Sequence, residues 1–521
     1  MAAKQASSAV MRLKQGGPML GWPMLGWPML GWAVLGWAVL GWAVLGLAGC
    51  TVGPDFHPPQ ISVPSRFVAR SKAAPAWPKP GWWRNFGSPE LDRLMAAARA
   101  HNFSVIEAVD QLEAANAQIR VSGAPLLPSI TGSGSGNFQQ EGVGAAGAGS
   151  STGAGAGGLR GATITSHHYS GSFSASYELD FWGKNRDALR AAQANAAAAA
   201  FNEKTVALTE EAAVATTYFQ VLADEDQLHI AEQNLAAASA LLKQLRAEYK
   251  AGVIDQPTVA QQAALVAAQR ATIPNLTSAL RQQAIGLGIL TGQAPEFLRV
   301  QGGSLAALHV PPLQPGLPSQ LLARRPDVAQ ATANLIAAND NVRGAIAAFF
   351  PSISLTGSAG WQSAALNTLI SPGSLLLSAA SSISQPIFEG GALSGTLAVD
   401  RATYREDVAK YEQSVVQAFT DVETAMTALH YATVQEHLQR IAVQRAQAAL
   451  AGAEAQLQAG TVDVSTVLNA EQTVLSDQNT LVQARLTRFQ AAVNLYKAMG
   501  GGWIGPGAAG DAAARSQQIG R

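Results

Sequence analysis

The sequence predicts an α+β membrane protein in which several copies share one β-barrel and long antiparallel coiled-coil helices continue it. Three observations indicate this fold class. Motifs in the first half of the chain return in the second half, and several stretches alternate between apolar and polar residues. In addition, residues 184–251 contain neither glycine nor proline, the two residues that most often interrupt a helix.

The overall composition narrows the functional class. Of 521 residues only 13% are charged, and 35 basic residues balance 35 acidic ones. A nucleic-acid partner requires a basic patch, which this balance does not supply. Cys50 is the only cysteine, so no disulfide can form within the chain. After Cys50 no uncharged apolar run reaches about 20 residues, so no later helix is expected to span a bilayer.

The N-terminal region has the features of an export signal. After a basic start, residues 18–50 form apolar five-residue units that end at Cys50. The final "LAGC" resembles the lipobox of bacterial lipoproteins, whose cysteine becomes the acylated first residue, and Thr51 in place of Asp favours the outer membrane. The alternative is a retained transmembrane helix, which the frequent glycine and proline disfavour. We expect a signal peptide at 1–49 and an acylated tether at 50–80.

The chain contains an internal two-fold repeat. "AANAQIR" (114–120) returns as "AANDNVR" (337–343), and "AGVIDQPTV" (251–259) returns as "AGTVDVSTV" (459–467). We expect one repeat at 81–293 and another at 319–499, with a Pro-rich linker at 294–318 and a flexible tail at 500–521. Each repeat should contain a helix of about 35 residues, two strands, a very long helix and a return helix of about 40 residues.

Hydrophobic residues at seven-residue spacing predict antiparallel coiled-coil hairpins, with an ordinary helix bundle as the alternative. In the second long helix Glu436 is the one break in this stripe. Tyr249 and Leu457 complete the two stripes, so we expect them to pack in the core rather than to form a gate. The stripes are Val214, Val221, Leu228, Leu235, Leu242 and Tyr249, and Val422, Leu429, Val443, Leu450 and Leu457.

Four segments are expected to be strands. Residues 169–181 alternate without an error, residues 351–361 do the same, and 128–138 and 376–388 are less regular. Such alternation over about 10 residues is typical of outer-membrane strands, although a half-buried strand of a soluble sheet is the alternative. Four strands cannot close a barrel, and lipid does not tolerate an open edge, so two, three or four copies must share one barrel.

Together these features resemble the outer-membrane factors of bacterial efflux and type I secretion systems, in particular the lipidated OprM/NodT group of the TolC-like family. Three blocks carry the resemblance: "CTVGPDFHPP" (50–59), "GWWRNFGSPELDRLMAAARAHN" (81–102) and the "LPSQLLARRPDV" block within 317–360. The resemblance implies a homotrimer whose 12-stranded barrel lies in the outer membrane of a Gram-negative bacterium, with a helical tunnel through the periplasm. It also implies two partners, a periplasmic adaptor and an inner-membrane pump of the RND type.

The turns between the long helices are the candidate periplasmic gate. Gly252 and Gly460 are suited to left-handed conformations there. Asp255 and Asp463 either cap the next helix or, once per copy around a symmetry axis, form a carboxylate ring that favours cations. In TolC-like channels the narrowing acids lie a few residues after this turn. The matching positions here are Thr258, Thr466 and Asn469, so an apolar or polar constriction is an open alternative.

The remaining motifs are given structural interpretations. In "RRPDV", Asp327 follows Pro326 at a helix start, and we expect Arg324 and Arg325 to pair with acids of a neighbouring helix. His167 and His168 lack nearby ligands, so we expect no metal site, and few methionines after Cys50 disfavour a copper-export lumen.

No catalytic motif is present, so the chain is interpreted as a passive conduit for small molecules without a cofactor, apart from lipid on Cys50. A surface-anchored coiled-coil structural or adhesive lipoprotein without a pore is the alternative.

Overall fold

The computed structural model describes residues 52–68, 76–142 and 163–505. The chain divides into two compact units, Met1–Cys50 and Thr51–Arg521, and everything below concerns the second. The predicted signal peptide, Cys50 and most of the tail therefore lie outside the described residues. Within the described ranges, none of the helices combines the length and the apolar character needed to cross a bilayer.

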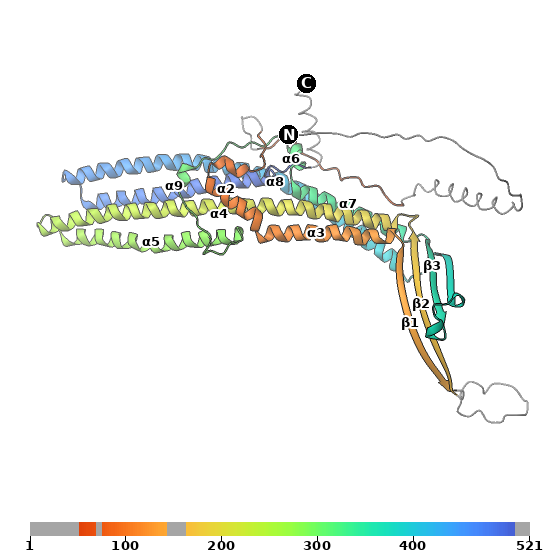
Figure 1. Ribbon diagram of the computed structural model, residues 1–521. Coiled ribbons are helices and arrows are strands. Elements are labelled where there is room, and N and C mark those ends of the chain that lie inside the picture. Colours follow the sequence, from red (N-terminus) through yellow and green to blue (C-terminus); the bar gives the residue numbers. More distant parts are fainter. Residues whose placement is uncertain (1–51, 69–75, 143–162, 506–521) are drawn as a thin grey trace, which may run out of the picture. The chain divides into compact units, whose positions relative to one another are not determined.

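Both repeats fold into the same series of elements (Figure 1). The first contains η1 (Trp82–Phe86), α2 (Pro89–His101), α3 (Phe103–Gly123), η2 (Ala124–Leu126), β1 (Ser129–Gly142), β2 (Thr163–Leu179), α4 (Lys184–Lys250) and α5 (Gln256–Leu290). After η3 (Leu305–Ala307), the second contains α6 (Pro318–Leu322), α7 (Pro326–Ala347), β3 (Ser352–Ser363), η4 (Leu366–Thr368), η5 (Pro372–Ser374), β4 (Leu375–Ser384), α8 (Ala392–Gln458) and α9 (Val464–Ala498).

The long hairpins confirm the predicted helices. Helices α4 and α8 both contain 67 residues, and α5 and α9 both contain 35. The first helix of each repeat, by contrast, is not continuous. In the first repeat α2 ends at His101. The side chain of the next residue, Asn102, accepts a hydrogen bond from the backbone N–H of Val105 and so starts α3 as a new helix.

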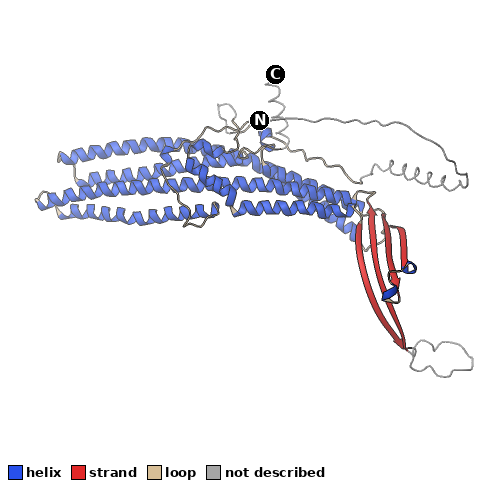
Figure 2. Ribbon diagram, in the orientation of Figure 1, coloured by secondary structure: helices blue, strands red, loops and turns tan. Residues whose placement is uncertain are grey.

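The strands form one antiparallel sheet in the order β1-β2-β3-β4 (Figure 2). Residues with hydroxyl groups follow one another on one face, because the register places Ser174 between Thr131 of β1 and Ser358 of β3. The opposite face is mainly apolar, with Phe173 beside Gly132 and Ala359. A Cβ on Gly132 would lie 3.2 Å from the Phe173 ring, which shows that the aromatic side chain covers the glycine.

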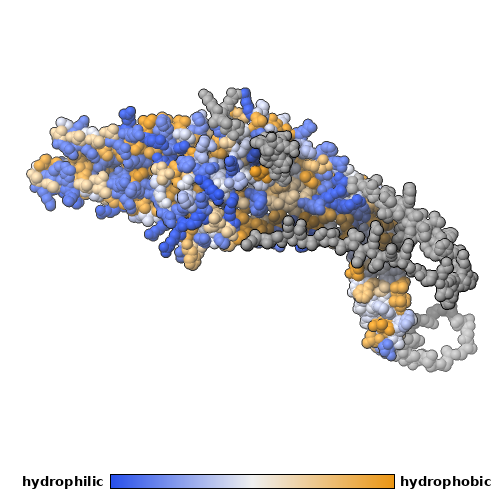
Figure 3. Space-filling model, turned by 45° about the horizontal axis from the view of Figure 1, so that its top comes forward, coloured by the Kyte–Doolittle hydropathy of each residue, from blue (hydrophilic) through white to orange (hydrophobic). Residues whose placement is uncertain are grey.

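The helices lie side by side in one layer. Near the sheet the order is α3, α4, α7, α8, and toward the turns it is α5, α4, α9, α8. The main core lies midway, where Trp82 and Phe86 of η1 pack on α4 and α9. Trp82 is fully buried and stacks on Tyr496 with ring centroids 4.8 Å apart. Apolar and hydrophilic residues are interspersed over the helices on the face shown in Figure 3.

The heptad stripes are partly confirmed. Val214 and Val221 are buried, and Leu457 packs on a small cluster near the turns. The expectation for Tyr249 was wrong, because this side chain is 45% exposed near the C-terminal end of α4.

Candidate functional site

The structure brings the two predicted turns together. Leu245 of α4 and Ile254 of the first turn share an apolar cluster with Leu457, Val464 and Leu468 of the second hairpin. Both turns lie at the end of the helices remote from the sheet (Figure 1). The candidate gate residues of the two repeats therefore form one region rather than two.

Each turn has the predicted backbone. Gly252 and Gly460 adopt φ values of 78° and 70°, which an L side chain rarely adopts. Asp255 caps α5 by accepting from the backbone N–H of Thr258 at 3.3 Å, and Asp463 caps α9 by accepting from that of Thr466 at 3.2 Å. The capping role is thus visible in the structure, and it leaves both side chains exposed to solvent.

Both capping carboxylates are held in the charged form. The Thr258 hydroxyl and backbone N–H lower the pKa of Asp255. The Ser465 hydroxyl, followed by the backbone N–H of Thr466, lowers the pKa of Asp463. Each copy therefore carries these two ionised cap carboxylates at neutral pH.

The three positions that match the acids of TolC-like channels remain uncharged. The Thr258 and Thr466 hydroxyls donate to Asp255 and Asp463 at 2.5 and 3.2 Å. Asn469 is exposed one turn further along α9, where its carbonyl accepts from the Thr473 hydroxyl. These three side chains thus add no negative charge to that of the two caps.

The polar face of the sheet is a surface of paired hydroxyl groups. Across β1 and β2, Ser129 and Ser176 lie 2.7 Å apart and Ser135 and Ser170 lie 2.8 Å apart. Across β3 and β4 the same spacing joins Ser354 to Ser382 and Ser358 to Ser378. Because these groups bond to one another and stay exposed, the face suits contact with water.

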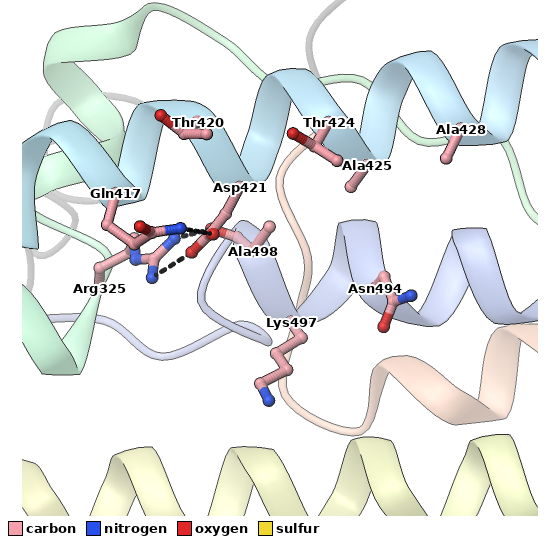
Figure 4. Close-up of a pocket in the computed structure, with 10 residues that line it drawn as sticks. All are labelled: Arg325, Gln417, Thr420, Asp421, Thr424, Ala425, Ala428, Asn494, Lys497 and Ala498. Atoms are coloured by element: carbon pink, nitrogen blue, oxygen red, sulfur yellow. Dashed lines mark hydrogen bonds and ion pairs between the residues drawn. The ribbon is translucent and has the colours of Figure 1, made fainter.

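The "RRPDV" motif joins three helices around a cavity of about 440 Å³ (Figure 4). Arg325 is buried and binds Asp327 at 2.5 Å and Asp421 of α8 at 2.9 Å. It also donates to the carbonyl oxygen of Ala498 in α9. Burial lowers the pKa of Arg325, but the bonds to Asp327 and Asp421 outweigh this, and the net pKa is raised. Arg324 instead lies over the Trp77 ring, 4.8 Å from its centroid.

Sequence reasoning missed the partners of Glu436. This residue is only 3% exposed, and its carboxylate binds Arg440 at 2.7 Å, Arg488 at 2.8 Å and Arg485 at 3.4 Å. Burial raises the pKa of Glu436, but the hydrogen bonds from Arg488 and Arg440 more than compensate, so the pKa is lowered. In the sequence Glu436 stands out as the single charged residue in a heptad stripe. Its partners could not be predicted, because Arg485 and Arg488 lie on another helix, α9.

The described chain begins beside the base of the sheet. The N–H of Val52 donates to the carbonyl of Trp182, and Asp55 binds Arg343 at 3.4 Å. The Trp182 indole donates to the carbonyl of Pro351 at 2.8 Å and stacks on Phe350. Aromatic residues of this kind are enriched where a membrane meets water.

Over the described ranges, no group of His, Cys, Asp and Glu side chains is arranged to hold a metal.

Comparisons with known proteins agree with this architecture. A model of the outer membrane efflux protein family matches residues 94–293 and 317–501, so the chain belongs to that family. The Pyoverdine export outer membrane protein OpmQ of Pseudomonas aeruginosa is 36% identical over 282 residues, which cover 53% of this chain and 57% of that protein. The chain thus spans little more than half the length of that relative.

Two further proteins are similar over more of their length. The Cation efflux system protein CusC of Escherichia coli is 29% identical over 369 residues, which cover 70% of this chain and 76% of CusC. The open-state crystal structure of the Neisseria gonorrhoeae MtrE outer membrane channel has a TM-score of 0.77 and 28% identity, and the match covers 87% of this chain and 98% of MtrE. These findings confirm the predicted α+β fold with four strands per copy.

Proposed function

We propose that this chain is the outer-membrane channel of a tripartite efflux system in a Gram-negative bacterium. Three copies form a passive conduit, and an inner-membrane pump with its periplasmic adaptor delivers small molecules to it. The similar OpmQ and CusC proteins are named for pyoverdine export and cation efflux. Two such different cargoes on one architecture favour a general conduit whose cargo is chosen by the pump.

The sheet supports assembly into a closed ring. In one copy β1 and β4 are its two edges, and each edge presents unpaired backbone groups. Lipid supplies no hydrogen bonds to such groups, so copies must join β4 to the next β1 until the ring closes. Three copies give about 12 strands, which lies within the range of known barrels. A pore-free adhesive protein has no use for two open edges of this kind.

The hydroxyl face is the observation that carries the proposal. Over most of β1, β2 and β3 one face is polar or small and the other is apolar or glycine, as expected when water fills the barrel and lipid surrounds it. Strand β4 is less regular, because Leu376 lies on the hydroxyl face and Ser381 lies on the opposite one. The conduit performs no covalent chemistry and needs no cofactor. Water and solute pass along the hydroxyl groups.

The N-terminal segment supports a lipid anchor on Cys50. Because Val52 is bonded to Trp182, three residues after β2 ends, acyl chains on Cys50 would enter the membrane leaflet next to the barrel. Processing at this cysteine with removal of residues 1–49 is part of the proposal.

We place the gate at the two turns. Asp255 and Asp463 carry charge there, and three-fold symmetry would arrange six carboxylates around one axis. Asp255→Asn and Asp463→Asn should lower the preference for cations in a planar bilayer. If conductance and ion preference both stay unchanged, the carboxylates act as helix caps alone.

Cysteine accessibility tests the conduit directly. Ser172→Cys and Ser358→Cys place thiols on the hydroxyl face, and Ala175→Cys and Ala359→Cys are matched controls on the apolar face. A positively charged, water-soluble thiol reagent should reduce the conductance of the first pair and not of the second. Equal reaction on both faces, or no conductance from the purified protein, would contradict a lumen on this side of the sheet.

A further inference from the structure

The two edges of the helical layer carry opposite unpaired charges. Near the sheet the layer ends with α3 on one side and α8 on the other. Asp110 and Glu113 are exposed on the face of α3 turned away from its buried Ala108, and Arg401 and Arg405 are exposed on α8. Over the described part of the chain, no ion pair or hydrogen bond involves any of these four side chains.

The internal repeat supplies a template for the contact between copies. In a ring of copies, α8 meets the next copy's α3 in the same way that α4 meets α7 within one copy. Within a copy, Arg343 of α7 binds Asp187 of α4 at 3.5 Å. The corresponding positions in the other repeat are Arg120 of α3 and Gly395 of α8.

This template sets the height of the charges along the contact. The two helices are antiparallel, so a step toward the N-terminal end of α3 corresponds to a step toward the C-terminal end of α8. Starting from Arg120 and Gly395, Glu113 comes level with Ala402, which lies between Arg401 and Arg405. In the same way Asp110 comes level with Arg405. Apolar side chains accompany them, since Ile106 on this face of α3 is 42% exposed and Val399 of α8 is 63% exposed.

The geometry points to an ionic seam between copies, formed by Asp110 and Glu113 of one copy and Arg401 and Arg405 of the next. This inference rests on the proposed ring and adds the residues that join it. It also explains a difference between the repeats. The positions of α7 that match Asp110 and Glu113 are Ala333 and Ile336, so the equivalent contact within a copy lacks these charges. The charges therefore distinguish the contact between copies from the contact within a copy.

Charge reversal tests the seam. Variant A carries D110R and E113R, variant B carries R401E and R405E, and variant C carries all four substitutions. Like charges then meet in A and in B, and opposite charges meet again in C. We expect the fraction of heat-resistant oligomer in detergent to fall by about tenfold or more in A and in B and to recover in C. The control, E232R with K243E on exposed positions of α4, should leave that fraction unchanged.

A mixture of variants A and B tests the ionic seam and the number of copies in the ring independently. In an alternating ring every A–B contact is favourable, but a ring of three always contains one contact between identical variants. Co-expressed A and B should therefore remain defective, although each separately should retain its helical circular dichroism. Rescue by mixing would show an even-numbered ring and contradict the trimer while keeping the seam. Stable oligomers of A or B alone, or failure of C to recover while A and B are folded, would overturn the seam.

Discussion

Replacing Glu436 should reveal how much the charged layer of the second hairpin contributes to stability. Glu436→Leu removes the carboxylate but leaves Arg485 and Arg488, whose side chains are 17% and 27% exposed, without a counter-charge. Breaking a buried ion pair in this way costs about 3–5 kcal/mol. Arg440 is 50% exposed and adds only about 0.2–1 kcal/mol, so we expect a loss of about 3–6 kcal/mol overall.

The first hairpin provides the matched control. Its equivalents of Glu436, Arg485 and Arg488 are Leu228, Thr277 and Leu280. The triple variant E436L/R485T/R488L transplants that uncharged layer, and removal of a whole buried ion cluster is commonly neutral or stabilising by about 1–4 kcal/mol. It should therefore recover most of the loss.

Guanidinium unfolding of the detergent-solubilised protein, followed by helical circular dichroism at one protein concentration, measures these differences. The pKa of Glu436 is lowered in the folded state, so its stabilisation is present above the carboxyl's ordinary pKa and is lost as pH falls through the folded pKa. A single variant as stable as the wild type, or a triple variant no better than the single one, would refute the role assigned to the arginines.

Two further sets of substitutions test the physical account of the hairpins. Burial and the nearby Glu454 raise the pKa of Glu471, so the contribution of this residue to stability falls as pH rises from the ordinary carboxyl range through the folded pKa. Glu471→Gln should remove that pH dependence and be more stable than the wild type at pH 7. Unfolding midpoints measured across pH test this. Gly252→Ala or Gly460→Ala should destabilise the protein by about 1 kcal/mol, because alanine disfavours the positive φ at these positions. The same substitution at Gly452 inside α8 should stabilise the protein by about 1 kcal/mol. Equal effects at the three sites in thermal unfolding would contradict the left-handed turns.

The sequence by itself determined the parts of this protein that repeat with a local period. The uninterrupted α4, the hydroxyl alternation of β2 and the turns at Gly252 and Gly460 all follow from neighbouring residues, because helix and strand place side chains at fixed intervals. The prediction that Arg325 pairs with an acid of a neighbouring helix was confirmed, whereas Arg324 lies over the Trp77 ring instead.

Only the tertiary structure decided which distant groups meet. It paired Glu436 with arginines of α9, stacked Trp82 on Tyr496 and left Tyr249 exposed at the end of its stripe. Periodicity shows that a position faces a neighbour, but it does not identify the neighbour. That identity depends on how the two repeats lie against each other, and this arrangement is fixed by packing between residues hundreds of positions apart.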